Sequence, residues 1–467
     1  MKNLHLLLML VLGGGVELMA QPFLLSFGDN LVGEKGIVAH VMPDESLWIF
    51  GVTDVGVLGG SDIIHTRRDL QGNIINSTRN LGSSDLDYPN NMIVKDGQMI
   101  VVGEVFGSAG GDATVFVMDT LGGIVSRGQY GVPNQSEQFY DIKATADGGF
   151  VVTGFGTQPN SVSNDILVSK FDHNYQQEWL RIYDLGTNEI GMAVVERPTG
   201  GYFVTGDQLQ PNGNYNVILL AIDSLGNQLW DSTITSPYNG GCKQMKLYQD
   251  QIIIVGEMAT STSTAFDPYI IRLNLEGQVQ IQRTIPQTNN GDAIFDLVIQ
   301  DANTYFLTGY SYNPATASTD MVLMVVDSMT QVLDTRYYGG SSFDMAYDIQ
   351  LLPNNEVVMV GFSGIQNDNQ VFVVKDNLSN VLTVPTLSKA KHSSLSIAPN
   401  PVTNALQILD LPQGVSYQAS IYNGLGQVIW KGVLPNNHQL EVQQLAKGYY
   451  YLQVNYQQQS WTTPFCK

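Results

Sequence analysis

The stretch Tyr305–Gly309, YFLTG, decides the fold, because close variants of it recur along the whole chain. Each variant is a short run of apolar, mostly β-branched or aromatic residues that ends in glycine, a pattern typical of a β-strand. The other six variants are LWIFG, MIVVG, FVVTG, YFVTG, IIIVG and VVMVG, and the seven final glycines are Gly51, Gly103, Gly154, Gly206, Gly256, Gly309 and Gly361. Successive glycines lie 50 to 53 residues apart. A fixed period of this length predicts an array of seven similar units.

Each unit is predicted to hold four short strands, A to D. After the glycine come a polar loop and a second apolar run, then a turn and a last strand. The second run opens with an acidic or amide residue at Asp62, Asp112, Asp165, Asn216, Asp267, Asp320 and Asn369. In the third unit we expect strands near 139–146, 149–154, 165–172 and 177–184. Strand C of the sixth unit, Val322–Val326, is apolar throughout, which indicates cover on both faces.

Blades stacked around an axis provide such cover, so the chain is predicted to be all-β, with a seven-bladed β-propeller over residues 21–387. No unit shows the 3.6-residue periodicity of a helical repeat, and the coils of a parallel β-helix are shorter. The mature chain opens with FLLSFG, which matches the strand D pattern, whereas the seventh unit has only a weak fourth strand at Asn380–Leu387. We therefore expect Phe23–Phe27 to complete the last blade and pair two open edges.

The bulk properties point to an exported protein. Residues 1–20 read as a signal peptide, with Lys2, an apolar run from Leu6 to Leu12, and Ala20 at the end. No later stretch has the roughly 18 apolar residues of a membrane helix, so we expect no transmembrane segment. The formal net charge of −21 argues against nucleic acid and anionic membrane surfaces as partners.

No signature of catalysis or of a cofactor stands out. The six histidines show no H-x-x-H pairing, and Cys242 and Cys466 have no C-x-x-C or metal-type spacing. Neither a G-x-S-x-G nucleophile motif nor a D-x-D-x-D-G calcium loop is present in the sequence. The sequence therefore nominates no catalytic residue, no metal ligand and no cofactor. A pair of glycosidase carboxylates among the 43 acidic residues stays open.

Two features indicate where a ligand would bind. The B–C segments, GTQPNSVSN, DQLQPNGNY, EMATSTSTAF and YSYNPATAST, read as long polar loops that gather on one face. Thirteen residues before each repeat glycine, a mixed polar column in strand A is predicted to line the central channel. It comprises Val38, Asn90, Asp141, Ala193, Lys243, Asp296 and Asp348. The column one residue earlier is largely apolar and is expected to pack between blades: Ile37, Pro89, Tyr140, Met192, Cys242, Phe295 and Tyr347.

Channel-lining candidates for binding are thus Asn90, Asp141, Lys243, Asp296 and Asp348. Three aspartates in one ring are a reasonable set of oxygen ligands for a cation. Such residues more often cap strand ends or meet water in the channel, and both interpretations stay open.

The repeats stop near Leu387, and the polar segment at 388–393 reads as a linker. Residues 394–467 then alternate apolar and polar residues between turns, as in a small Ig-like β-sandwich. Three ordered motifs carry a resemblance here: Pro399-Asn400-Pro401, Tyr422 followed by Gly426, and Gly448-Tyr449. This segment resembles the type A C-terminal sorting domain of cargo proteins of the type IX secretion system. The resemblance implies transit to the periplasm, passage across the outer membrane, and a secreted or cell-surface protein.

Three hypotheses about function remain after this reading. The first is a non-enzymatic secreted or surface-attached binding or adhesion protein that uses the propeller as a scaffold for a glycan or a protein. The second is a polysaccharide-active hydrolase or lyase with carboxylates at the channel mouth. The third is a structural or assembly component, which an apolar patch on one rim would favour. The fold alone does not choose among them, because propellers host all three.

Overall fold

The computed structural model describes two units of the chain, Met1–Leu382 and Thr383–Lys467, each of which is considered by itself. The described residues are 23–467 without 29–32, 43, 54–60, 70–71, 82–85, 108–109, 132–134, 159–160, 162, 237, 260–265, 286–290, 315, 353–354, 365–368, 378–396, 399–401, 410, 412–416, 424–427, 436, 448 and 457–458. The proposed signal peptide, linker and weak strand at 380–387 thus lie outside them. None of the described residues belongs to a helix that is long and apolar enough to span a membrane.

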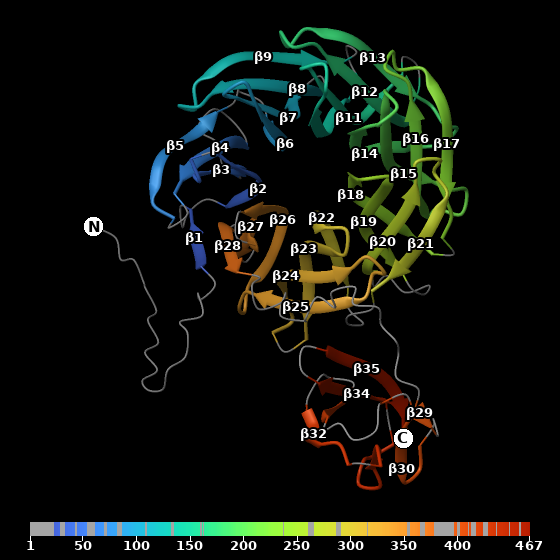
Figure 1. Cartoon of the computed structure of the whole chain (residues 1–467). Coiled ribbons are helices and arrows are strands. Elements are labelled where there is room, and N and C mark those ends of the chain that lie inside the picture. Colours follow the sequence, from blue (N-terminus) through green and yellow to red (C-terminus); the bar gives the residue numbers. More distant parts are fainter. Residues whose placement is uncertain are drawn as a thin grey trace. The chain divides into compact units, whose positions relative to one another are not determined.

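The first unit is a ring of seven four-stranded antiparallel sheets, as predicted (Figure 1). Blade 1 contains β2 (Glu34–Val41), β3 (Leu47–Thr53), β4 (Asp62–Arg68) and β5 (Ile74–Leu81). Blade 2 contains β6 (Leu86–Lys95), β7 (Gln98–Gly107), β8 (Gly110–Asp119) and β9 (Ile124–Tyr130). Blade 3 contains β10 (Gln138–Ala144), β11 (Phe150–Thr157), β12 (Asn164–Phe171) and β13 (Gln177–Tyr183). Blade 4 contains β14 (Glu189–Glu196), β15 (Tyr202–Leu209), β16 (Tyr215–Ile222) and β17 (Gln228–Ile234).

The remaining blades repeat this order. Blade 5 contains β18 (Gly240–Tyr248), β19 (Gln251–Ala259), β20 (Phe266–Asn274) and β21 (Val279–Thr284). Blade 6 contains β22 (Asp292–Asp301), β23 (Thr304–Asn313), β24 (Ser318–Asp327) and β25 (Val332–Tyr338). Blade 7 contains β26 (Phe343–Leu352), β27 (Glu356–Gly364), β28 (Gln370–Asn377) and β1 (Phe23–Phe27). Strand A of each blade lies nearest the axis and strand D lies on the outside (Figure 1).

The N-terminal strand closes the ring. β1 pairs antiparallel with β28, from Phe23 opposite Lys375 to Phe27 opposite Val371. The prediction that Phe23–Phe27 completes the last blade is therefore confirmed. The guanidinium of Arg68, in blade 1, lies 3.7 Å from the ring centroid of Phe27, so this strand also contacts the next blade.

Blade-to-blade packing explains the continuous apolar runs in strand C. In β24 of blade 6, Val322 and Met324 pack in one buried cluster with Ile253 of blade 5. The alternate residues Leu323 and Val325 belong to another cluster, which they share with residues of blade 7. Successive side chains of a strand point to opposite faces, so each blade needs apolar residues at every position to bury both.

The repeat glycine is required by a close approach of strands A and B. A Cβ on Gly154 would lie 1.7 Å from the carbonyl oxygen of Gln138 in the neighbouring strand. At the other six glycines the nearest strand A carbonyl oxygen would be 1.8 to 2.0 Å away. Any side chain here would force the inner strand away from its partner, which is why the glycine recurs in every blade.

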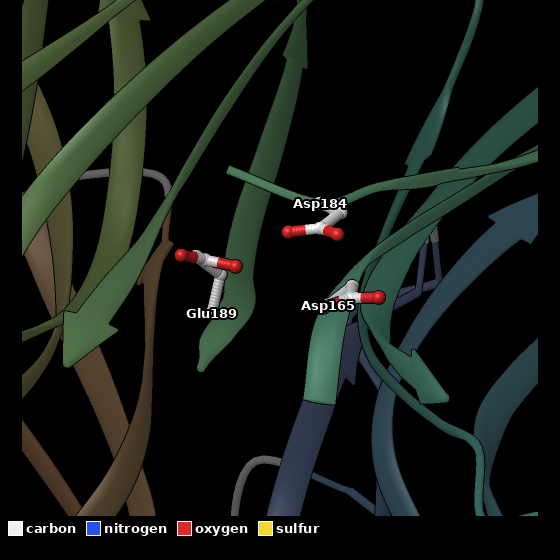
Figure 2. Close-up of side chains that lie close together, drawn as sticks. All are labelled: Asp165, Asp184 and Glu189. Carbon is white, nitrogen blue, oxygen red and sulfur yellow. The ribbon is translucent and has the colours of Figure 1, made fainter. Parts of the chain in front are cut away.

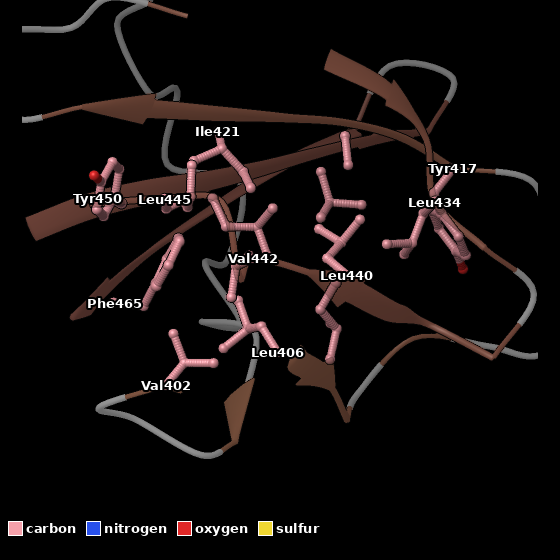
Figure 3. Close-up of a cluster of buried hydrophobic side chains, with 14 of the residues drawn as sticks. Val402, Leu406, Tyr417, Ile421, Leu434, Leu440, Val442, Leu445, Tyr450 and Phe465 are labelled. Carbon is pink, nitrogen blue, oxygen red and sulfur yellow. The ribbon is translucent and has the colours of Figure 1, made fainter. Parts of the chain in front are cut away.

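The second unit is a small sandwich of two sheets. One sheet orders β29 (Ile397–Ala398), β30 (Ala405–Ile408) and β33 (Gln439–Glu441), and the other orders β32 (Val428–Val433), β31 (Gln418–Asn423), β34 (Tyr449–Tyr456) and β35 (Gln459–Cys466). Leu406 and Leu440 from the first sheet pack with Ile421 and Phe465 from the second in one buried cluster (Figure 3). This arrangement agrees with the predicted small β-sandwich.

Candidate functional site

A β-bulge in every strand A shapes the central channel. Beside each repeat glycine, two strand A residues face one strand B residue, and the extra residue interrupts the pairing. The seven bulge residues are Ile37, Asn90, Tyr140, Met192, Lys243, Phe295 and Tyr347. All seven line a cavity of about 370 Å³ at the axis, together with Val38, Asn91, Gln244, Asp296 and Asp348.

The seven bulge residues form one ring around this cavity. It is called the aromatic ring here, after its three aromatic members Tyr140, Phe295 and Tyr347. Strand A runs from the face that carries the D–A and B–C connections toward the A–B turns, so this ring lies nearer the B–C face. Phe295 and Tyr347 contact each other with ring centroids 5.3 Å apart. The ammonium of Lys243 lies 5.8 Å from the ring centroid of Phe295 and 3.1 Å from a carboxylate oxygen of Glu257. The ring therefore offers aromatic faces and one paired cation.

The residues one position further along strand A, polar in five of the seven blades, form a second ring, here called the polar ring. Strand A is the inner edge of each blade, so alternate backbone N–H groups have no strand partner and need another acceptor. Three aspartates supply it across the blade junctions. The pairs are Ala39 N to Asp348 Oδ2 (3.0 Å), Val194 N to Asp141 Oδ2 (3.0 Å) and Ile349 N to Asp296 Oδ2 (3.2 Å). In each pair the aspartate belongs to the preceding blade.

In two other blades, an amide side chain of the same strand accepts the hydrogen bond from the edge N–H group. Blades 1 and 4 carry Val38 and Ala193 in the polar ring, and neither side chain accepts a hydrogen bond. In the blades that follow them, Met92 N donates to Asn91 Oδ1 (2.7 Å) and Met245 N donates to Gln244 Oε1 (2.8 Å). The polar ring thus serves first to satisfy edge N–H groups.

Lysines neutralise most of the charge in the polar ring. Lys143 Nζ lies 2.5 Å from Asp141 Oδ1, and Lys246 Nζ lies 3.4 Å from Asp296 Oδ1. Burial lowers the pKa of Lys246, but the carboxylates of Asp296, Asp141 and Asp348 outweigh it and raise that pKa. Asp348 accepts from the neutral Gln350 amide at 3.1 Å, and burial together with the charge of Asp296 raises its pKa well above the ordinary range.

The structure brings together most of the predicted binding residues. Asn90, Lys243, Asp296 and Asp348 line the cavity, whereas Asp141 is buried and is not among the lining residues. Asn90 and Lys243 occupy the aromatic ring, one position away from the three aspartates. The column predicted thirteen residues before each repeat glycine therefore contains residues of both the aromatic ring and the polar ring.

The register shift has a local cause. In blades 2 and 5 the A–B turn has two residues, Asp96-Gly97 and Gln249-Asp250, whereas the corresponding turn of blade 3 spans 145–149. Asp96, Gly97 and Gln249 have positive φ of 50°, 73° and 53°, as tight hairpin turns require. In blades 2 and 5 the bulge residue lies 13 residues before the repeat glycine, whereas in blade 3 it lies 14 residues before it. A count of 13 therefore reaches the bulge residue in blades 2 and 5 but the next residue in blade 3.

The expectation that the apolar column packs between blades holds only in part. Cys242 is a fully buried free thiol in an inter-blade cluster. Ile37, Tyr140, Met192, Phe295 and Tyr347 instead line the channel, because they are the bulge residues. Turn length accounts for the difference between blades 2, 3 and 5, whereas blade 6 combines a two-residue turn with a second bulge at Gln300.

The B–C connections are shorter than predicted. β15 ends at Leu209 and β16 begins at Tyr215, which leaves a turn at 210–214. β23 and β24 leave only 314–317. In blades 4 and 6 several polar residues at the ends of these segments pair across the B–C hairpin and so belong to the strands. The antiparallel A–B–C–D order still puts every B–C connection on one face.

A second polar feature lies at the junction of blades 3 and 4 and has no counterpart among the predicted residues. Asp165, Asp184 and Glu189 each place one carboxylate oxygen within 4.8 Å of the other two (Figure 2). Asp165 and Glu189 are buried and Asp184 is exposed. The acidic openers of strand C pointed to Asp165, but no spacing rule linked it to the other two.

The landmark residues of the C-terminal unit are described only in part. Pro399, Asn400, Pro401, Gly426 and Gly448 lie outside the described residues, and Tyr449 begins β34. Tyr422, in β31, donates from its hydroxyl to Gln453 Oε1 at 2.9 Å, which links β31 to β34.

Residues 396–466 match the family described as a secretion system C-terminal sorting domain. The resemblance found in the sequence is thus confirmed: the chain is a β-propeller protein that ends in a type IX sorting domain. This domain indicates export by the secretion machinery to the cell surface or the medium. No curated protein matches the chain.

Several solved propellers are similar in fold. Catalytically inactive virginiamycin B lyase from Staphylococcus aureus with quinupristin has 12% identity and a TM-score of 0.48, covering 76% of this chain and 98% of that one. The WD40 domain of Neurospora crassa Pan2 has 10% identity and a TM-score of 0.46, covering 72% and 88%. The propeller domain of the Trilobed protease from Pyrococcus furiosus has 10% identity and a TM-score of 0.42, covering 73% and 95%. Similarity at this level carries no information about ligand or activity.

Proposed function

We propose that this protein is a non-enzymatic binding or adhesion protein of the cell surface or the medium, whose propeller binds a glycan or a protein at its B–C face. Residues 1–20 serve as its signal peptide, residues 21–387 as its binding domain and residues 394–467 as its export domain. The observation that carries the proposal is the aromatic ring, where Tyr140, Phe295 and Tyr347 line a cavity of about 370 Å³. Pockets lined by aromatic side chains with a few polar groups are the usual form of ligand sites.

The charges of the polar ring support binding rather than catalysis. Asp141, Asp296 and Asp348 each accept a backbone hydrogen bond from the next blade. Two of them also face a lysine. Because these aspartates are already engaged in contacts between and within blades, we assign ligand contact to the aromatic ring, which includes Lys243.

The test is a glycan array and a pull-down with the mature full-length protein and two tyrosine variants. Tyr347→Ala removes a face of the aromatic ring, whereas Tyr337→Ala removes a tyrosine that is 51% exposed on the outer strand β25. We expect Tyr347→Ala to weaken binding of any selected ligand by about tenfold or more, a loss of ~1.4 kcal/mol or more typical of an aromatic contact. Equal binding by both variants would place the ligand elsewhere.

One observation favours a second candidate, a polysaccharide-active hydrolase. Burial and the charge of Asp296 raise the pKa of Asp348, and both side chains line the same cavity. A carboxyl group with a raised pKa beside a second carboxyl group is the pattern of a general acid with its partner. Release of reducing ends from a polysaccharide panel, lost in Asp348→Asn, would establish this function. A wild-type protein that releases none from any polysaccharide it binds would exclude it.

A further inference from the structure

We propose that the junction of blades 3 and 4 binds a divalent cation of the calcium class through Asp165, Asp184 and Glu189. This site is separate from the channel and does not depend on the proposed binding function.

The position of the three residues in the repeat explains why this junction is special. Asp165 lies at the start of strand C, Glu189 opens strand A of the next blade, and Asp184 directly follows strand D. Tyr183, Tyr130 and Tyr338 occupy the same position of strand D in blades 3, 2 and 6. They pair with the strand C residues Ile166, Ala113 and Met321, respectively. The residue after these tyrosines is Gly131 in blade 2 and Gly339 in blade 6. Blade 3 therefore has a carboxylate where those blades have glycine.

Neutral donors hold the three carboxylates in place. Asp184 Oδ1 accepts from Gly186 N at 2.8 Å. Glu189 Oε1 accepts from Thr187 N (2.9 Å), Thr187 Oγ1 (2.7 Å) and Gln208 Nε2 (3.3 Å), and Oε2 accepts from Leu185 N at 3.3 Å. Asp165 Oδ1 accepts from Ser163 Oγ at 3.2 Å. These contacts orient the oxygens but bring no positive charge.

The second oxygen of Asp165 is the independent sign of a missing partner. Asp165 is 0% exposed, and its Oδ2 is buried without a hydrogen bond. A buried carboxylate oxygen without a partner is costly, which is why such atoms normally bond a donor or a metal. In the described part of the chain no lysine, arginine or histidine forms an ion pair with any of the three acids.

Two other junctions show what happens without a third carboxylate. Where blade 2 meets blade 1, Asp87 in β6 lies 3.0 Å from Arg127 in β9 of the same blade, so a side chain of blade 2 supplies the cation for this carboxylate. Between blades 6 and 7, a Cβ on Gly339 would lie 2.4 Å from Asp344 Oδ2 and 2.8 Å from Asp320 Oδ1, so the glycine leaves an acidic pair. The junction of blades 3 and 4 alone among these combines three carboxylates with no cationic side chain.

The chemistry of the donors selects the cation. Ca²⁺ takes six to eight oxygen ligands in a flexible geometry, and carboxylates from three separate segments suit it. Asp184 is exposed, which gives the ion a path from solvent and leaves room for water ligands. The absence of sulfur and imidazole ligands from the cluster disfavours zinc and copper.

The experiment measures calcium binding by calorimetry and thermal unfolding of the mature full-length protein. We expect one site per chain and a midpoint of unfolding that is several degrees higher in 1 mM CaCl2 than in EDTA at equal ionic strength, because the ion binds the folded state. Asp184→Gly restores the residue of blades 2 and 6, and Asp184→Asn keeps the size of the side chain. Both are expected to weaken calcium binding by about tenfold or more and to remove the stabilisation.

Asp112→Asn is the matched control, since it removes one carboxylate from the opener position in blade 2, and it should leave calcium binding unchanged. Asp184 is exposed, so its variants are expected to fold, and circular dichroism in EDTA checks this. A wild-type protein that shows neither heat nor stabilisation with Ca²⁺ would overturn the proposal. So would equal calcium binding by Asp184→Gly and the wild type.

Discussion

The carboxylate of Asp348 accepts a hydrogen bond of 3.0 Å from the backbone N–H of Ala39, across the junction where the last blade meets the first. The same contact recurs from Asp296 to Ile349 and from Asp141 to Val194. These aspartates therefore connect neighbouring blades at the channel wall, near the same depth as the repeat glycines. Their first role is to satisfy the inner edges of the sheets.

We expect Asp348→Ala to lower the free energy of unfolding by about 1–3 kcal/mol, because it leaves the buried N–H of Ala39 without an acceptor. Asp348→Asn retains an oxygen acceptor and should cost less than half as much. Chemical denaturation of both variants at pH 7 measures the difference. A matching loss in the two variants would mean that other contacts of the Asp348 carboxyl group, and not this hydrogen bond, matter.

Substitution of a repeat glycine should be far more damaging. A Cβ at Gly154 would lie 1.7 Å from the carbonyl oxygen of Gln138, so Gly154→Ala must displace strand A. We expect a loss of more than about 3 kcal/mol in unfolding free energy. Gly340→Ala is the control, since no heavy atom lies within 4 Å of its added Cβ, and it should change stability by no more than about 0.5 kcal/mol. Similar unfolding midpoints for the two variants would contradict the steric explanation.

The closing strand depends on Phe27, which lies under the guanidinium of Arg68 and lines a small cavity beside Ile49 and Val371. Phe27→Ala should destabilise the protein by about 2 kcal/mol through lost burial and lost cation–π contact. Phe106→Ala, at a side chain that is 46% exposed, is the comparison and should have little effect. Differential scanning calorimetry of the pair decides, and a larger loss for Phe106→Ala would refute the importance of the closing strand.

His65 predicts an acid-sensitive first blade. Its ring is buried against Trp48 and Phe50, with centroids 5.1 and 5.5 Å away, and burial lowers its pKa to about 4. A lowered histidine pKa contributes stability that is present above pH 6.5, the unfolded value, and is lost as pH falls toward 4. The loss is on the order of 2 kcal/mol by pH 4.5.

His65→Leu should therefore show a shallower decline in unfolding free energy between pH 7 and pH 4.5 than the wild type. The exposed His173→Leu serves as the control and should follow the wild-type curve. Parallel pH profiles for His65→Leu and wild type would show that another group titrates.

Much of the fold was accessible from the sequence because its strongest constraint is local. The glycine that ends strand B is fixed by a single close approach, so it marks every blade at nearly constant spacing. In the third blade the predicted strands, near 139–146, 149–154, 165–172 and 177–184, begin and end within three residues of β10 to β13. The closing strand was also predictable, since FLLSFG has the pattern of strand D.

The candidate sites were less accessible because they depend on turn geometry and on contacts between blades. Counting from the glycine places Asn90 and Lys243 with the aspartates, but the two-residue turns at Asp96-Gly97 and Gln249-Asp250 shift them into the aromatic ring. Tyr140 and Phe295 looked like core residues because a bulge leaves no trace in apolar periodicity. The acidic cluster joins residues from two blades, and only the alignment of Asp184 with Gly131 and Gly339 hints at it.

The pairing of β1 with β28 has a consequence for the order in which the protein matures. Phe23 in β1 pairs with Lys375 in β28, so β1 has no pairing partner until nearly the whole propeller has been synthesised. Before this pairing forms, β1 and the edge of β28 are both unpaired strand edges. The nascent chain must therefore be protected from aggregation with other copies of itself. The sorting domain follows β28 in the chain. A chain that carries a complete sorting domain has therefore already synthesised every strand of the propeller.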